Sequence, residues 1–183
     1  MKKLTLLLIA VPSVIFAQLN EGFEGGNITE WEQSDPSRWA ASSIVPITGA
    51  YSLHHIYNNT MAGHDQISIP LHNIGLDSAL TTWKFNVRHG YPPSGSNNWG
   101  VFLVSDMNAH QMFPSGLANG YVLGVNYSGT DDMVKLWKVT SGAGSTILNT
   151  GFDWEGEVMT TDVIGFQVSR TTDGSWNVKI DTS

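Results

Sequence analysis

The stretch of residues 120–139, GYVLGVNYSGTDDMVKLWKV, constrains the fold of this chain more than any other part of the sequence. Two runs rich in Val, Leu, Tyr and Trp flank the cluster SGTDD at residues 128–132, and small polar residues of this kind reverse a chain between antiparallel strands. The stretch therefore predicts a β-hairpin. Side chains alternate between the two faces of a strand, so one face of the first arm carries Tyr121, Leu123, Val125 and Tyr127.

The second arm of this hairpin is apolar on both faces. One face carries Met133, Trp137 and Val139 beside Lys135, and the other carries Val134 and Leu136 beside Lys138. Polarity alone does not decide which face points inward, so the register of this arm stays open. A hairpin of this kind belongs in the middle of a sheet. It predicts a curved sheet in a two-layer sandwich, with one face in the core and the other lining a groove.

Other segments carry strand patterns as well. Trp83, Phe85 and Val87 alternate with polar or charged residues, which is the pattern of a strand with one buried face. The apolar run within residues 99–105 predicts a strand that is covered on both faces. Asp-Gly at residues 173–174, between two alternating arms, predicts a second hairpin, because glycine supplies the positive φ that the turn needs.

The part of the chain before residue 80 has weaker patterns. Residues 18–39 predict an opening strand followed by a loop, and residues 50–56 and 66–71 are further strand candidates. No segment of ten or more residues shows convincing helical periodicity. We therefore predict an all-β fold, a two-layer antiparallel sandwich of the jelly-roll type.

The first 17 residues, MKKLTLLLIAVPSVIFA, have the order of a secretory signal peptide: two lysines, an apolar run, and a small residue before Gln18. The apolar run is shorter than the roughly 20 residues that a bilayer-spanning helix needs. We expect cleavage after Ala17 and one jelly-roll domain over residues 18–183. The mature chain is then secreted or held on the outer cell surface, without membrane insertion.

Composition narrows the class further. The chain has no cysteine, so a core formed by burial, as in an exported bacterial protein, is expected in place of a disulfide framework. The formal net charge is −7, and the first 17 residues hold two lysines and no acid, so the remainder is more acidic still. Binding to phosphates draws on clustered Lys and Arg, and we expect no nucleic-acid partner.

Three phrases of the sequence carry a family resemblance. The phrases are NEGFEGGNITEWEQ, then AYSLHHIYNNT followed by DQISIP, and then NWGVFLVSD leading to GYVLGVNYSGTDDMVKLWKV. Together they resemble the concanavalin A-like jelly-roll modules of secreted Bacteroidetes proteins, of the cleaved-adhesin and MAM type. The likeness implies a module at the front of a larger surface or secreted protein, exported by type IX secretion through a C-terminal sorting domain. The final hairpin arm would be an unpaired edge, so we also expect the last strands and further domains to follow Ser183 in the natural polypeptide.

The resemblance also implies a structural calcium ion, held between the opening acidic strand, the Tyr-Ser-Leu strand and an acid on the closing strand, which we expect to follow Ser183. The matching positions here are Glu24 and the region of His55. Calcium accepts a mixed set of carboxylate and carbonyl oxygens from irregular loops. Gly22 stands where some relatives have an aspartate, and solvated surface acids are the alternative. Zinc is disfavoured, because the adjacent His54 and His55 point to opposite faces of a strand.

Catalytic patterns are weak in this sequence. Glycoside hydrolysis needs two carboxyl groups about 5 to 10 Å apart across a cleft, and glucanases of this superfamily carry them in a Glu-x-Asp-x-x-Glu pattern. Glu155-Gly156-Glu157 and Asp162 break that pattern, which favours a solvated acidic turn. Ser, His and Asp occur without the Gly-x-Ser-x-Gly elbow of nucleophilic hydrolases. We predict no catalytic residue. If the domain is an enzyme, a glycoside hydrolase is the class that we expect.

Carbohydrate binding is the function that the residues favour. Sugar-binding surfaces combine an aromatic platform with a few polar groups that fix orientation. The loop at residues 91–99 supplies Tyr91, Asn97, Asn98 and Trp99, and the central hairpin adds Asn126, Tyr127 and Asp131. A core position is the alternative for Trp99.

The sequence thus predicts an extracellular, non-catalytic carbohydrate-binding or adhesion module whose partner is a glycan or another cell-surface ligand. A glycan-hydrolase domain and a spacer module without a ligand are the alternatives, because the fold alone does not decide function.

Overall fold

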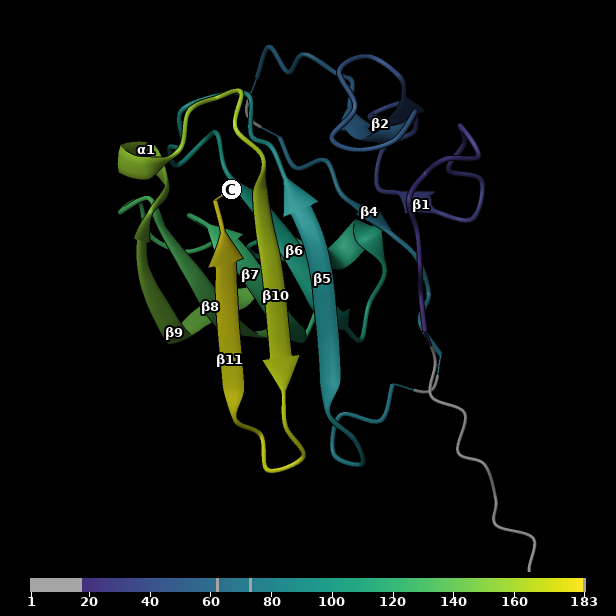
Figure 1. The fold of residues 1–183 in the computed structure, drawn as a ribbon. Coiled ribbons are helices and arrows are strands. Elements are labelled where there is room, and N and C mark those ends of the chain that lie inside the picture. The colour runs from purple at the N-terminus through teal and green to yellow at the C-terminus, as the bar shows by residue number, and fades with distance from the viewer. Residues whose placement is uncertain (1–17, 62, 73, 183) are drawn as a thin grey trace, which may run out of the picture.

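The structure is a computed structural model that describes residues 18–61, 63–72 and 74–182. The predicted signal peptide lies outside these residues. The described part of the chain forms eleven β-strands, one 3-10 helix and one short α-helix. The predicted all-β fold is confirmed: two antiparallel sheets pack face to face in a two-layer, jelly-roll-type sandwich (Figure 1). None of the helices described has the length and hydropathy that crossing a bilayer requires.

The larger sheet has the strand order β6-β7-β8-β9. Its strands are β6 (Trp99–Ser105), β7 (Gly120–Val125), β8 (Met133–Thr140) and β9 (Ala143–Asp153). The predicted central hairpin is confirmed as β7 and β8, which pair antiparallel from Gly120 opposite Val139 to Val125 opposite Val134. The hairpin lies in the middle of the sheet, with β6 and β9 on its two sides.

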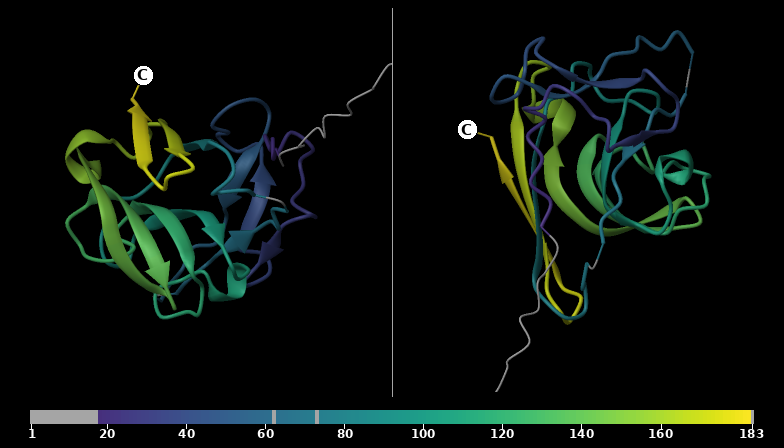
Figure 2. Two further views of the ribbon diagram at one scale, coloured as in Figure 1. Left: turned by 90° about the horizontal axis from the view of Figure 1, so that it is seen from below. Right: turned by 90° about the vertical axis from the view of Figure 1, so that its right-hand side faces the viewer.

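The second layer is a three-stranded sheet with the order β11-β10-β5. It consists of β5 (Thr81–Val87), β10 (Ile164–Arg170) and β11 (Trp176–Asp181). The alternation predicted for β5 is confirmed, because Trp83, Phe85 and Val87 pack against the core while the residues between them are exposed. The predicted hairpin joins β10 to β11, and Gly174 has a φ of 88° in its turn. Figure 2 shows this layer facing the curved four-stranded sheet.

The main core lies between these two sheets. Its buried members come from both layers and from the short helix α1 (Trp154–Glu157): Leu103, Leu123, Val125, Val134, Leu136, Trp154, Ile164, Phe166 and Val168. Phe166 is central, since its ring centroid lies 5.5 Å from that of Phe85 and 5.5 Å from that of Trp99. Aromatic pairs at these separations contribute roughly 0.5 to 1.5 kcal/mol each beyond burial, so Phe166 ties the two sheets together.

A second buried cluster covers the other face of the larger sheet. It consists of Val122, Tyr127, Trp137 and Val139, with Phe102 beside it. The prediction that this sheet is apolar on both faces is confirmed. The prediction that β6 is covered on both faces holds in part, because Leu103 is buried in the main core while Phe102 is only partly buried against the outer cluster. The predicted groove on the outer face is wrong, because Val122 is 0% and Trp137 is 1% exposed. At Val122 and Trp137 the outer face is therefore covered and forms no open groove.

The predicted face of Tyr127 is also corrected by the structure. Its ring belongs to the outer cluster with Trp137, whereas Tyr121, Leu123 and Val125 face the main core. The cause is Asn126, whose φ of 56° breaks the alternation of the strand just before Tyr127. Successive side chains alternate between the two faces only as long as the backbone stays extended.

Two small sheets stand beside the sandwich (Figure 1). One pairs β1 (Glu32–Gln33) with β4 (Ile67–Ser68), and the other pairs β2 (Trp39–Ser42) with β3 (Ser52–His55). The strand candidates at residues 50–56 and 66–71 are therefore confirmed in shortened form. The 3-10 helix at residues 109–111 docks here, because the Ala109 N–H donates to Ser68 Oγ at 2.9 Å and Asn108 Nδ2 donates to Glu32 Oε1 at 3.0 Å.

Candidate functional site

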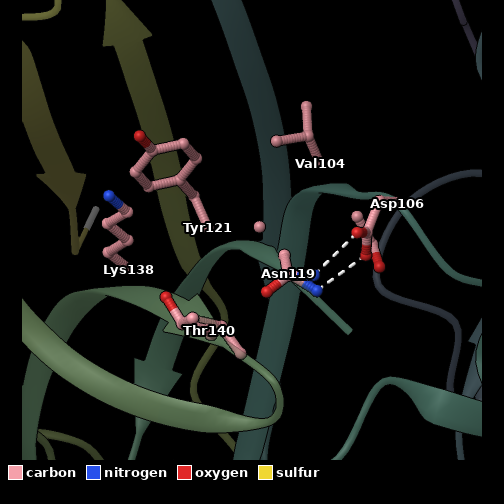
Figure 3. A pocket seen from close by; sticks show the side chains of 9 residues that line it. Val104, Asp106, Asn119, Tyr121, Lys138 and Thr140 are labelled. Carbon is pink, nitrogen blue, oxygen red and sulfur yellow. Dashed lines mark hydrogen bonds between the residues drawn. The ribbon is translucent and has the colours of Figure 1, made fainter. Parts of the chain in front are cut away.

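An open depression of about 460 Å³ lies at the end of the larger sheet where β6 and β8 finish and β7 begins (Figure 3). Its lining consists of three short segments that are far apart in the sequence: Val104, Ser105, Asp106, Asn119, Gly120, Tyr121, Lys138, Val139 and Thr140. The lining therefore offers an aromatic ring, hydroxyl groups, an amide, a carboxylate and an ammonium group around one hollow.

The sheet register places three of these side chains in a row. Tyr121 pairs with Val104 on one side and with Lys138 on the other. Residues that stand opposite one another in an antiparallel pair share a face, so all three point from the larger sheet toward the layer of β10 and β11 (Figure 3). Antiparallel pairing, and not closeness in sequence, thus assembles the floor of the depression.

Aromatic packing supports this row from the core side. The ring centroid of Tyr121 lies 4.8 Å from that of Trp176 on β11, and Trp176 stacks on Trp83 of β5 at 5.7 Å. Arg170 lies beside Trp176, with its guanidinium carbon 5.8 Å from the ring centroid. The Tyr121 ring is therefore fixed against the opposite sheet.

Asp106 and Asn119 fix the rim of the depression. One carboxylate oxygen of Asp106 accepts the backbone N–H of Asn119 at 2.7 Å, and the other accepts its side-chain Nδ2 at 2.8 Å. The amide oxygen of Asn119 accepts the N–H of Ser141 at 3.0 Å. The hydrogen bonds from Asn119 hold the pKa of Asp106 below its usual range, so this carboxylate is ionised at neutral pH. Each of its oxygens keeps a lone pair for a ligand.

Lys138 is the cation of the depression. Its side chain is exposed at the end of β8, and no ion pair between described residues includes it, whereas Lys135 pairs with Asp131 and Arg170 with Asp77. Adjacent strands lie about 4.8 Å apart, so β6 and β8, on either side of β7, are about 10 Å apart. The cation and the Asp106 carboxylate therefore stand at opposite sides of the Tyr121 ring.

The ligand residues predicted in the loop lie at the other end of the sandwich. Tyr91 is 61% exposed, and Asn97 and Asn98 are exposed in the loop between β5 and β6. A Cβ atom at Gly95 would lie 3.6 Å from Cγ2 of Thr130. This loop and the β7–β8 turn therefore meet, and the structure brings these two predicted segments together.

Four further predicted ligand residues lie on or beside the central hairpin, and three of them are buried or partly buried. Trp99 lies with its ring centroid 4.9 Å from that of Trp154. Asn126 is 5% exposed, and Tyr127 is 9% exposed and donates its hydroxyl hydrogen to the Gly142 carbonyl at 3.0 Å. Burial raises the pKa of Tyr127 to about 12.

Asp131 is the fourth of these residues and is open to solvent. Its side chain is 53% exposed and forms an ion pair with Lys135, which lowers the pKa of Asp131. At this end of the sandwich, Asp131 therefore joins Tyr91, Asn97 and Asn98 as an exposed group.

The two predicted calcium positions take part in protein hydrogen bonds. Both carboxylate oxygens of Glu24 accept the backbone N–H of Ala50, at 3.0 and 3.2 Å. His55 Nε2 lies 2.8 Å from Asp65 Oδ2. Among the described residues, no group of three or more His, Cys, Asp and Glu side chains is placed to hold a metal ion. Calcium needs six to eight oxygen ligands, and its binding here stays a prediction.

The acidic cluster near the C-terminal end has a local structural role. Asp153 caps α1, because its side chain accepts the N–H of Gly156 at 3.0 Å, and Glu157 accepts the N–H of Asp153 at 3.2 Å. Glu155 and Glu157 are exposed. The predicted solvated acidic turn is thus a single capped helical turn.

The sequence did not point to the depression itself. Tyr121 and Lys138 lie in the predicted hairpin, but Lys138 had no decided face, and Asp106 and Asn119 lie beyond strand ends in unpatterned loops. In the register of the folded sheet, Gly120 stands opposite Val139, and this places Tyr121 beside Lys138. Local sequence patterns do not determine this register, because contacts across the whole sheet set it.

Together, fold and site define an all-β sandwich with an open, polar-rimmed depression at one sheet end. Comparisons with protein-family models, with curated proteins and with solved structures found no match.

Proposed function

We propose that this protein is an extracellular, non-catalytic carbohydrate-binding or adhesion module of a larger secreted or cell-surface protein. One observation supports this function best: the ring of Tyr121 lies in an open depression that is rimmed by Asp106, Lys138 and Thr140. An oligosaccharide has apolar ring faces and many hydroxyl groups that both donate and accept hydrogen bonds. Such a ligand matches an aromatic platform with a few fixed polar groups.

The openness of the depression favours a chain-like ligand. Its lining lies at a sheet end, reached from solvent, and its rim is fixed by the Asp106–Asn119 hydrogen bonds. A rigid rim reduces the conformational entropy that binding costs. The partner is therefore proposed to be a surface or matrix glycan, and Tyr121 and Asp106 are its proposed contacts.

Binding is tested with purified residues 18–183 against a panel of soluble neutral and acidic polysaccharides, by calorimetry and affinity electrophoresis. Tyr121→Leu keeps apolar volume against Trp176 but removes the hydroxyl and the aromatic face, and we expect at least a tenfold loss of affinity. Tyr91→Leu at the opposite end is the matched control and should leave affinity unchanged. Thermal unfolding of both variants checks that the fold is intact.

Other results would indicate a different binding site or a different function. Loss of binding in Tyr91→Leu alone would move the site to the loop end, where the sequence placed it. Release of reducing ends by the protein would indicate a glycan hydrolase. Absence of binding and of turnover across the panel would leave a spacer module without a ligand.

A further inference from the structure

The charge in the depression points to the class of sugar that it binds. The chain has 16 acidic and 9 basic residues, and three of its cations, Arg38, Lys135 and Arg170, lie in ion pairs with aspartates. Lys138 instead faces the depression, and no acid of the described residues pairs with it. A cation that lacks an internal partner at a binding surface is available to an anionic group of the ligand.

The positions of the two charges give the site a direction. Lys138 stands directly opposite Tyr121 in the β7–β8 pair, and Asp106 lies past the end of β6, on the far side of β7 (Figure 3). The strand spacing separates the two sides by about 10 Å. An anionic group of the ligand is therefore attracted to the Lys138 side and repelled from the Asp106 side. Hydroxyl groups of the ligand suit the Asp106 side, because they can donate hydrogen bonds to the ionised carboxylate.

We infer, on the basis of the proposed function, that the depression binds an acidic sugar residue whose carboxylate or sulfate group pairs with Lys138. The apolar face of the sugar ring lies on Tyr121, and its hydroxyl groups donate to Asp106. The contact between an ammonium and an exposed anion is modest in water and is screened by salt. The preference for acidic glycans is therefore strongest at low ionic strength.

The rival interpretation is that Lys138 is a solvated lysine and that the depression binds neutral sugars through hydroxyl contacts alone. Lys84 is the matched control for Lys138 that tests this rival interpretation. Lys84 is also exposed on a strand, but it lies on the outer face of the three-stranded sheet, away from the depression. The two lysines contribute equally to net charge, so only a site-specific contact distinguishes them.

The test uses pairs of polysaccharides that share a backbone, one member of each pair being anionic and the other neutral. Purified residues 18–183 are titrated with polygalacturonate and its fully methyl-esterified form, and with dextran sulfate and dextran, at 20 and 300 mM salt. We expect the wild-type protein to bind at least one acidic polymer about fivefold more tightly than its neutral partner at low salt. The pair that shows the difference identifies the anion as carboxylate or sulfate.

Substitutions then assign the contact. Lys138→Gln should remove the preference and bring the acidic polymer to the affinity of the neutral one, while Lys138→Arg should retain it and Lys84→Gln should leave it unchanged. Equal affinity of the wild-type protein for acidic and neutral partners overturns this inference but leaves the proposed function intact. An equal loss in Lys138→Gln and Lys84→Gln also overturns it. Absence of binding to every polymer overturns the proposed function itself.

Discussion

Asn126 shows how one residue decides the course of the chain. It has a φ of 56° and is 5% exposed at the end of β7. Its amide donates to Asp132 Oδ1 at 2.6 Å and accepts the Asp132 N–H at 3.1 Å. Asparagine is one of the few residues that visit the left-handed region readily, and these hydrogen bonds hold it there. The result is that Tyr127 turns outward to pack near Trp137.

Substitution of Asn126 is expected to be costly for stability. Asn126→Ala removes two hydrogen bonds and leaves a Cβ residue in the left-handed region, so we expect a loss of about 2 to 3 kcal/mol in the free energy of unfolding. Asn126→Gly removes the same hydrogen bonds without the conformational cost and should lose about 1 kcal/mol less. Urea unfolding followed by tryptophan fluorescence measures both. Equal losses would show that the backbone conformation contributes nothing.

Asp65 is the residue at which acid should weaken the small β2–β3 sheet. Burial by itself raises the pKa of this carboxyl, but hydrogen bonds from His55 at 2.8 Å and Asn59 at 2.9 Å, together with the charge of Arg38, lower it overall. A lowered pKa in the folded state means that ionised Asp65 stabilises the fold above its unfolded pKa of about 3.9. This contribution is lost as the pH falls through the folded pKa.

The Asp65→Asn variant tests this linkage. At pH 6 we expect it to unfold with about 1 to 3 kcal/mol less free energy than the wild type, because the charge-assisted hydrogen bonds are gone. The difference should shrink steadily below about pH 4. Urea unfolding of both proteins from pH 6 to pH 2 measures it. A difference that stays constant over this range would contradict the prediction.

At the scale of elements, glycines allow β6 and β7 to approach each other. A Cβ atom at Gly124 would overlap the Trp99 carbonyl oxygen and lie 2.8 Å from the Gly100 Cα, both of them backbone atoms of β6. Backbone atoms in a paired strand cannot move aside without breaking the ladder. Gly124 therefore matters for its lack of a side chain, and its φ is not in the left-handed region.

Gly124→Ala is expected to lower the free energy of unfolding by about 2 to 3 kcal/mol through overpacking. Gly90→Ala in the β5–β6 loop is the control, because nothing lies within 4 Å of a Cβ built there; its effect should stay within about 0.5 kcal/mol. Thermal and urea unfolding of the two variants makes the comparison. Similar values for both would show that β6 shifts freely to accept the methyl group.

The sequence predicts those elements whose signal is local. β5 has a clean alternation, and the β10–β11 and β7–β8 hairpins have turn residues between apolar arms, so their patterns need no distant partner. β2 was missed because its segment, WAAS, has no alternating pattern. The depression was missed for a related reason: strand ends around residues 105, 120 and 139 form it together, and only the register of the folded sheet joins them.

At the scale of the whole molecule, the two small sheets, formed by β1 to β4, share little apolar packing with the sandwich, formed by β5 and the later strands. Every residue in the two hydrophobic clusters comes from β5 or later, and no residue of β1 to β4 belongs to either. The small sheets and the loop between them are attached by hydrogen bonds, such as that from Ala109 N–H to Ser68 Oγ. The ring of His64 also stacks on that of Phe113, with 5.1 Å between the centroids. Hydrophobic burial supplies most of the stabilisation of a fold, so the sandwich should be much the more stable part.

This difference should appear in native-state hydrogen exchange. We expect the amides of β7 and β10, which lie inside their sheets, to exchange only through global unfolding. The amides of β2 and β3 lie in a two-stranded sheet without a buried core, and a pair of strands of this kind is marginal on its own. They should exchange through local opening, with a free energy at least about 2 kcal/mol lower. Mass spectrometry of peptides covering residues 39–55 and 120–125 after deuterium labelling compares the two, and equal protection would mean that the small sheets unfold only together with the sandwich.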